Sequence, residues 1–290
     1  MKVIFLFFFF TASAVAGPYA PEVGAVGTTA IAKDDAAFVA WATVVEDYSV
    51  GAEVDAVWQD TSEALGQAEG LFDSVVVLGR GGSITLGFER AIVDGAGADF
   101  AVFENAISDF FLELAFVEVS EDGVNYVRFA NDSQTAGPVS SFGFVDPTDV
   151  TGLAGKYRLG YGVPFDLAEV GLASARFVRL VDVVGGTNTD TSGDVIYDPY
   201  PTMVSAGFDL DGVGVIHQAA PPIEILSAEV TGGQFVVEWA SEVGEEYVVR
   251  EWNEVTEEWD EVETVTATGF TGQVSLAVAG FAKRLVRVER

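Results

Sequence analysis

Short apolar runs with the two-residue period of β-strands dominate this chain, whereas helical periodicity is weak. The runs are rich in β-branched and aromatic residues and are bounded by Gly, Asp or Asn, which predicts an all-β, antiparallel β-sandwich. Asp122-Gly123, between two runs, predicts a tight hairpin. Segments 36–45 and 61–70 carry enough helical pattern for a turn or two. The predicted strands are residues 74–79, 83–88, 99–105, 114–120, 125–130, 176–184 and 206–217.

A short stretch at residues 219–222, with the sequence Ala-Ala-Pro-Pro, divides the strand-rich chain into two parts. Its composition is that of a stiff linker. Residues 17–218 are expected to form the large domain, and residues 223–290 contain enough strand patterns for a second, small sandwich. The acids of the second part alternate outward, so we expect no chemistry there. The aromatic residues spaced like its core anchors are Trp239, Tyr247 and Trp259.

The first residues, MKVIFLFFFFTASAVAGPYA, place a lysine before an apolar run that is followed by Ala14-Val15-Ala16. This order is typical of a secretory signal with an A-x-A cleavage site, so residues 1–16 are expected to be removed and Gly17 to begin the mature chain. The run is far shorter than the ~20 apolar residues that cross a bilayer, and no later segment approaches that length. We therefore expect a secreted protein, extracellular or at the cell surface, without a membrane span.

Composition narrows the chemistry further. The 290 residues include no cysteine, which removes disulfides and thiolate sites. Lys and Arg total 14 against 45 Asp and Glu, a net charge of −31, so the surface repels phosphate backbones and nucleic-acid binding is excluded. Acidity keeps an exported protein soluble. It also suits a hard cation, because calcium takes carboxylate and carbonyl oxygens as ligands.

Several carboxylates fall on strand faces that otherwise carry apolar side chains. Alternation puts Glu104 and Asp182 in line with apolar residues of their strands, and it puts Asp209 and Asp211 together on one face. An ionised carboxylate on such a face is unfavourable unless it is paired, hydrogen-bonded or bound to a metal. Nearby arginines offer salt bridges to Asp182, whereas Asp209 and Asp211 have no adjacent base and repel each other. A bound calcium would resolve this repulsion and add folding free energy.

Two Gly-rich loops, residues 142–171 and 185–202, supply further acids. Long ordered loops on a sandwich often carry function. The Asp-x-Asx spacing of the second loop is similar to that of calcium loops, although it lacks the twelve-residue pattern of an EF-hand. The predicted calcium ligands are Glu104, Asp146, Asp166, Asp182, Asp209 and Asp211.

Catalytic motifs are scarce. The single histidine, His217, comes at a strand end and gives little basis for a Ser-His-Asp triad. No P-loop, HExxH or dinucleotide fingerprint occurs, and the Gly-rich segment 79–83 joins two strands without opening a helix. Paired carboxylates could hydrolyse a glycoside, but nothing in the sequence fixes two at a catalytic separation. The favoured interpretation is a non-catalytic protein.

Several longer strings carry a resemblance to a known family. The strings VVVLGRGGSITLGFE, GADFAVFENA, LELAFVEVSEDGVNYVRF, DPTDVTGLAGKYRLGYGVPFDLAEVG and AGFDLDGVGVIH resemble a family of exported bacterial cell-surface proteins over roughly residues 18–218. Some members of that family end in a PEP-CTERM-type sorting tail. The layout is also distantly similar to discoidin or galactose-binding jelly rolls, which implies a jelly-roll sandwich. Residues 223–290 are similar to fibronectin-III-like repeats, which usually act as spacers or docking modules.

The resemblance and the acids together favour a calcium-stabilised surface protein that binds a glycan or another cell-surface component. Sugar binding needs acceptor groups and an aromatic platform, and aromatics on probable loops are available, although they could equally be core or rim residues. A structural envelope or matrix component and a carboxylate-dependent extracellular polysaccharide hydrolase remain alternatives. The predicted ligand-binding aromatics are Trp58, Tyr161, Tyr197 and Tyr200.

Overall fold

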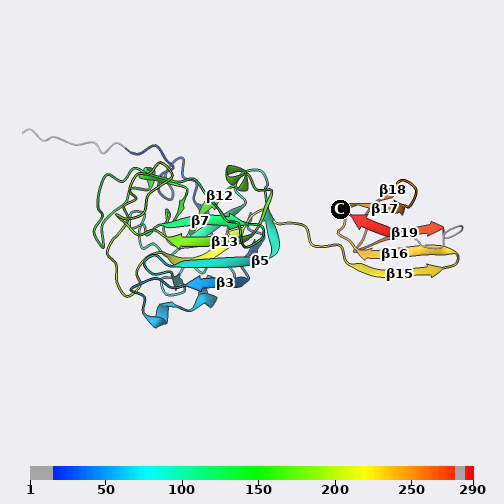
Figure 1. Cartoon of the computed structure of the whole chain (residues 1–290), viewed down its shortest axis with the longest axis horizontal. Helices are drawn as coiled ribbons and strands as arrows, with labels where there is room; N and C mark the ends of the chain where they lie inside the picture. The colour runs from blue at the N-terminus through cyan, green and yellow to red at the C-terminus, as the bar shows by residue number, and fades with distance from the viewer. Residues whose placement is uncertain (1–15, 278–284) are drawn as a thin grey trace, which may run out of the picture. The chain divides into compact units, whose positions relative to one another are not determined.

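The structure, a computed structural model, describes residues 16–277 and 285–290 and is mostly β-sheet (Figure 1). The prediction of an all-β protein is confirmed at this level. The predicted signal sequence lies outside the described residues, except for Ala16. None of the helices in the described part of the chain is long and apolar enough to cross a membrane.

The chain divides into two compact units, Met1–Ala219 and Ala220–Arg290. The first unit contains two larger sheets and a two-stranded ribbon, and every pair of strands is antiparallel. In order, the first sheet contains β1 (Ile31–Ala32), β12 (Tyr161–Phe165), β6 (Phe100–Glu104), β14 (Asp209–Val215) and β2 (Ala40–Trp41), with β4 (Val76–Val77) also on β14.

The second sheet lies across the core from the first, with β13 at its centre (Figure 1). In order, it contains β11 (Leu153–Ala154), β7 (Ala115–Ser120), β13 (Ser174–Asp182), β5 (Ser83–Val93) and β3 (Val44–Ser49), with β8 (Val127–Arg128) also on β7. The separate ribbon pairs β9 (Asp132–Ser133) with β10 (Val150–Thr151).

One hydrophobic core fills the space between the two sheets, because the alternating apolar residues of both sheets point into it. Phe100 and Val102 of β6 enter this core together with Val178 and Leu180 of β13. The other face of β6 is also covered, since Phe103 packs against the rings of Phe38 and Trp41. All five residues of β6 are therefore buried.

Within residues 16–277 and 285–290, helical structure is limited to single 3₁₀ turns. The pattern at 61–70 gives only one such turn, and the pattern at 36–45 gives strand, where β2 pairs with β14 and β3 begins. The Asp122-Gly123 hairpin joins β7 and β8 through a wider loop than predicted, because pairing begins only at Val119 and Val127. The 3₁₀ helices are η1 (Ala56–Trp58), η2 (Thr61–Ala64), η3 (Pro147–Asp149) and η4 (Leu167–Val170).

The second unit contains two three-stranded sheets around a small core that includes Trp239 and Tyr247, both fully buried. Trp259 was expected in this core but is only partly buried. It lies instead against Trp252, with the guanidinium of Arg287 over its ring. One sheet contains β15 (Ile225–Thr231), β16 (Gln234–Ala240) and β19 (Thr271–Ala277); the other contains β18 (Glu258–Thr266), β17 (Glu246–Asn253) and β20 (Val286–Glu289).

Candidate functional site

A group of buried acids gathers where strands of both sheets begin and end. Glu104 ends β6 and Asp209 begins β14, and pairing of Leu210 with Glu104 puts these strand ends side by side. In the second sheet Asp182 ends β13 opposite the start of β7. Each member is at most 7% exposed. We call Glu104, Glu113, Asp182, Asp198 and Asp209 the carboxylate cluster.

Four members of the carboxylate cluster have buried oxygens without a hydrogen-bond partner. Neither oxygen of Glu104 accepts a hydrogen bond of normal geometry, although the Ala106 N–H lies near. One oxygen each of Glu113, Asp198 and Asp209 is also without a partner. In the described part of the chain, no ion pair with Lys, Arg or His involves these four. Buried acceptors are normally paired, so this group is unusual.

Burial raises the pKa of these carboxyls, because an ionised carboxylate loses hydration that no donor replaces. For Glu104, burial and then the charges of Asp209 and Glu113 raise the pKa well above its usual range. Burial and the charges of Asp209 and Asp198 do the same for the pKa of Glu113. Burial raises the pKa of Asp209 to about 8, against the opposing effect of the Asn105 side chain. Without a cation, burial therefore favours the protonated form of these carboxyls.

Asp182 differs from the other four because its carboxylate has partners on both oxygens. It accepts hydrogen bonds from Gly81 N at 2.8 Å and from Phe208 N at 2.9 Å, and it thereby ties two loops together. Burial still raises the pKa of Asp182 to about 7. Gly207 lies so close that a Cβ there would be 2.4 Å from Asp182 Oδ1. The two backbone donors account for the burial of Asp182 without a metal, so we assign it a structural role.

A divalent cation is the chemistry that fits these donors. Calcium takes six to eight oxygen ligands, and carboxylates, amide oxygens and hydroxyls all serve. Glu104, Glu113, Asp198 and Asp209 supply the carboxylates, and the side chain of Asn105 lies beside Asp209. In the structure, the oxygens of these four carboxylates do not converge on one point. The one group of three acids in the described chain whose oxygens lie within 4.8 Å of one another is elsewhere. Holding an ion would require the four carboxylates to converge.

An apolar groove of about 500 Å³ opens over the carboxylate cluster. Glu113 and Asp209 line it, together with Asn105 and Thr202, and no Lys, Arg or His does. Several lining side chains are large, apolar and exposed, Phe142 at 81% and Met203 at 73%. Exposed apolar patches of this kind mark binding surfaces. The principal apolar lining residues are Trp58, Phe72, Ile107, Phe142, Met203 and Val204.

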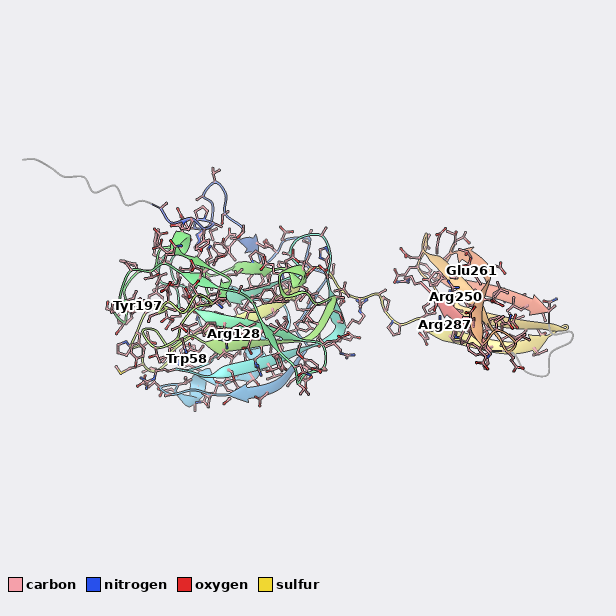
Figure 2. All side chains as sticks on the ribbon, turned by 45° about the horizontal axis from the view of Figure 1, so that its top comes forward. Trp58, Arg128, Tyr197, Arg250, Glu261 and Arg287 are labelled. Atoms are coloured by element: carbon pink, nitrogen blue, oxygen red, sulfur yellow. The ribbon has the colours of Figure 1, made fainter. Side chains whose placement is uncertain are left out.

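Of the four predicted ligand-binding aromatics, Trp58 alone lines this groove. Tyr161 packs against the main core, with Arg158 over its ring. Tyr200 accepts a hydrogen bond from Arg80 through its hydroxyl at 2.9 Å. Tyr197, labelled in Figure 2, is partly exposed. Its ring lies close to Gly186. The structure therefore does not assemble the four into one platform.

The predicted pair Asp209 and Asp211 does not form a joint site. A β-bulge leaves Asp211 unpaired between Leu210, which pairs with Glu104, and Gly212, which pairs with Phe103. The bulge shifts the alternation by one residue, so Leu210 and not Asp211 shares the core face with the later valines of β14. Asp211 instead accepts hydrogen bonds from Glu69 N and Gly70 N, at 2.8 and 2.9 Å. The interpretation that both acids share a face with Val213 and Val215 is therefore wrong.

The loop acids Asp146 and Asp166 each cap a short helix. Asp146 accepts hydrogen bonds from the Thr148 amide and hydroxyl at the start of η3. Asp166 accepts one from Ala168 N at the start of η4. Short polar side chains at such positions satisfy helix N–H groups, which explains both without a metal. Neither belongs to the carboxylate cluster.

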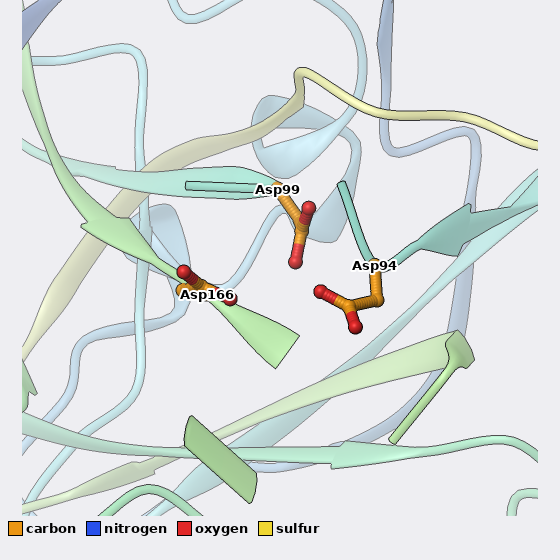
Figure 3. A group of neighbouring side chains, drawn as sticks. All are labelled: Asp94, Asp99 and Asp166. Carbon is orange, nitrogen blue, oxygen red and sulfur yellow. The ribbon is translucent and has the colours of Figure 1, made fainter. Parts of the chain in front are cut away.

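A second acidic group lies at the opposite end of β6, and its oxygens approach within 4.8 Å of one another. It consists of Asp94, Asp99 and Asp166, shown in Figure 3. Asp99, fully buried, accepts hydrogen bonds from Gly95 N at 2.8 Å and Leu167 N at 2.7 Å, and pairs with His217 Nδ1 at 2.8 Å. Because donors from the protein already surround Asp99, we assign this group, the Asp99 cluster, a structural role.

Sequence reasoning missed two members of the carboxylate cluster as ligands. Glu113 is the one acid inside the apolar run FFLELAF, and that position was a usable sign of burial. Asp198 lies in an irregular loop, where no periodicity distinguishes it from its neighbours. A Cβ on Gly185 would lie 2.3 Å from Asp198 Oδ1, so this glycine is needed for the close packing around the acid.

Comparison with models of protein families and with curated proteins found no match to this chain. The candidate site therefore stands on its own geometry.

Proposed function

We propose that this chain is an exported, non-catalytic surface protein whose first unit binds calcium through the carboxylate cluster and a glycan through the groove above it. The observation that carries the proposal is Glu104, which is 1% exposed and has two oxygens without hydrogen-bond partners. A buried charge in this state is unfavourable unless it is neutralised. Protonation neutralises it in the absence of metal, and a divalent ion would replace the protons.

Calcium is favoured over other cations by the donor set and by the setting. All the unpartnered donors are carboxylate oxygens, which suit a hard cation, and the chain has no cysteine for a softer one. Sites in extracellular modules commonly bind calcium with dissociation constants of about 10⁻⁴–10⁻³ M. A chain without disulfides would gain folding free energy from such an ion.

We further propose that the first unit is a jelly-roll sandwich and the second a fibronectin-III-like module. Taken in chain order, the strands β5, β6, β7, β12, β13 and β14 fall alternately in the two sheets of the first unit, with the short strands β8 to β11 between β7 and β12. In the second unit the first, second and fifth strands share one sheet, and the third, fourth and sixth share the other. This division is that of immunoglobulin-like sandwiches.

We propose the groove as the glycan site because its lining combines aromatic side chains with side chains that carry oxygen atoms. Trp58 and Phe142 offer apolar faces, and Asn105 and Thr202 offer hydrogen bonds. An ion held by Glu113 and Asp209 would face the same space, and sugar hydroxyls could complete its coordination. A volume of about 500 Å³ is in the range of small-ligand sites.

Two measurements test the proposal. Calorimetry of metal-free protein should show one calcium per chain, with binding lost in Glu104→Gln and retained in the matched variant Asp94→Asn. Binding to a glycan array should require calcium and be lost in Trp58→Ala, while Tyr161→Phe keeps it. Absence of calcium binding would overturn the metal site. Calcium binding without any glycan binding would leave a structural envelope or matrix component.

A second candidate, a polysaccharide hydrolase, is favoured by one observation. Glu113 and Asp209 both line the groove and both have a raised pKa, so either could protonate a leaving oxygen near neutral pH. Release of reducing sugar that is abolished by Asp209→Asn would establish the enzyme. Calcium should then not be required for turnover.

A further inference from the structure

The start of the described chain is fixed to the first unit at a site built from η3. Gly17 N donates to Thr148 Oγ1 at 2.7 Å, and that hydroxyl donates in turn to Asp146 Oδ1 at 2.7 Å. Two residues later, Tyr19 N donates to Thr148 O at 3.0 Å. The segment is thus held by main-chain and side-chain bonds on both sides of Pro18.

Only a glycine fits at the first of these positions. A Cβ on Gly17 would lie 2.2 Å from Thr148 O and 2.4 Å from Asp149 Oδ1. Real Cβ atoms do not approach other atoms so closely, and Thr148 is itself buried. The Asp149 carboxylate therefore lies directly beside the Gly17 main chain.

The acids at this site have no basic partner in the described structure. Asp149 forms no ion pair, and burial together with the charge of Asp146 raises its pKa. Lys156 feels the charge of Asp146, but its ammonium group donates to Val150 O. A positive charge at Gly17 N would complete the site.

We propose that hydrolysis of the Ala16–Gly17 bond is a maturation step whose product, the Gly17 ammonium group, docks between Thr148 Oγ1 and Asp149 and locks the first segment onto the first unit. Ala16 is exposed and follows the A-x-A pattern of a cleavage site. A signal peptidase would add water across the amide, leaving a carboxylate on Ala16 and an amine on Gly17 that takes up a proton. The single N–H of Gly17 becomes three, enough for both acceptors.

The inference rests on the proposed export but is tested separately from it. Three purified forms are compared by thermal unfolding: one beginning at Gly17 with a free amine, the same chain N-acetylated, and one retaining Ala16. The free-amine form should melt about 2–4 °C above the other two. The difference should vanish in Asp149→Asn and persist in Glu22→Gln, which changes another acid of the same segment whose side chain makes no hydrogen bond or ion pair with the described residues. Equal melting of free and acetylated forms would overturn the docking.

The pKa of the terminal amine provides a readout that does not depend on any variant folding. An unfolded α-amino group has a pKa of about 7.7–8.0, and pairing with Asp149 should raise it. The added stability should be complete below pH ~7.7 and disappear as pH rises through the higher folded value. The other titratable groups at the site are Asp146, Asp132, Tyr19 and Lys156.

Titration of ¹⁵N-labelled Gly17 by NMR measures that pKa directly. A value at or below about 8 in the folded protein would overturn the inference. Sequencing the amino terminus of the exported protein distinguishes failure of this inference from failure of the proposed export. A mature chain that begins at another residue would overturn cleavage at Ala16–Gly17. If the protein is not exported, the melting comparison of the three purified forms still tests the docking.

Discussion

Strand β6 has a group of buried acids at each end, and the protein treats the two groups in opposite ways. Before its first residue, Asp99 is surrounded by donors from Gly95, Leu167 and His217. At its last residue, neither oxygen of Glu104 accepts a hydrogen bond of normal geometry from the described residues. The acids of the Asp99 cluster lie closer together, yet the buried oxygens without hydrogen-bond donors belong to the carboxylate cluster. Proximity of acids is thus a weaker indication of a metal than buried oxygens without donors.

The largest effect is expected from Asp99→Ala. Three donors, of which the Leu167 N–H is buried, would lose their acceptor, which should lower the free energy of unfolding by about 3–5 kcal/mol. Urea unfolding should give the same loss with calcium and with a chelator. A loss that appears only with calcium would show that the Asp99 cluster binds the ion and would break the comparison.

Glu104→Gln should have effects of opposite sign in the two conditions. With a chelator the variant should be more stable than the wild type by about 1–2 kcal/mol at neutral pH, because the wild-type carboxyl must take up a proton to be buried and the amide need not. The stabilisation that calcium gives the wild type, about 2.7 kcal/mol at a hundred times the dissociation constant, should be lost. Thermal and urea unfolding measure both. A variant that is less stable in chelator would indicate a structural role for the carboxylate.

The stability of the metal-free protein should change with pH in the direction opposite to that expected from ordinary acidic residues. Burial raises the pKa of Asp182 to about 7 and of Asp209 to about 8, so the folded state binds more protons than the unfolded state. Stability should therefore fall as pH rises from about 4 to 8, by at most about 1.4 kcal/mol per pH unit for each group. Calcium should flatten this slope. Denaturation at pH 5, 6, 7 and 8 tests it.

The smallest effect is expected from Asp94→Asn. Asp94 is exposed, and its side chain makes no hydrogen bond or ion pair within residues 16–277 and 285–290. Surface changes of this kind alter stability by about 0.5 kcal/mol or less. Calcium affinity, measured by calorimetry, should be unchanged. A calcium affinity that is tenfold weaker in this variant would indicate that the ion binds in the Asp99 cluster, at the other end of β6.

The sequence predicted the site best where the strands are regular. Alternation along β6 and β13 placed Glu104 and Asp182 among core side chains, and both are buried there. It failed at Asp209 and Asp211, because nothing in the local sequence marks the bulge at Asp211. Asp198 could not be predicted at all, since an irregular loop has no period and its position depends on distant packing.

The fold shows the same limit. The seven predicted strands of the first unit all contain strands in the structure, but local pattern missed the strands within residues 36–45 and within the Gly-rich loop 142–171. The order of strands in the sheets depends on pairings between residues far apart in the chain, such as β14 with β4 and β6. The groove is similar: its walls come from separate loops, and only Trp58 among the predicted aromatics reaches it. Local patterns carry no information about such convergence.

The extra residue in β14 could be removed without changing any partner of this strand on β6. Leu210 and Gly212 already pair with the adjacent residues Glu104 and Phe103, so deleting Asp211 would make the ladder between the two strands regular. The Glu69 and Gly70 N–H groups would then lose their acceptor. Among homologous chains, a one-residue gap at this point would mark members without the bulge.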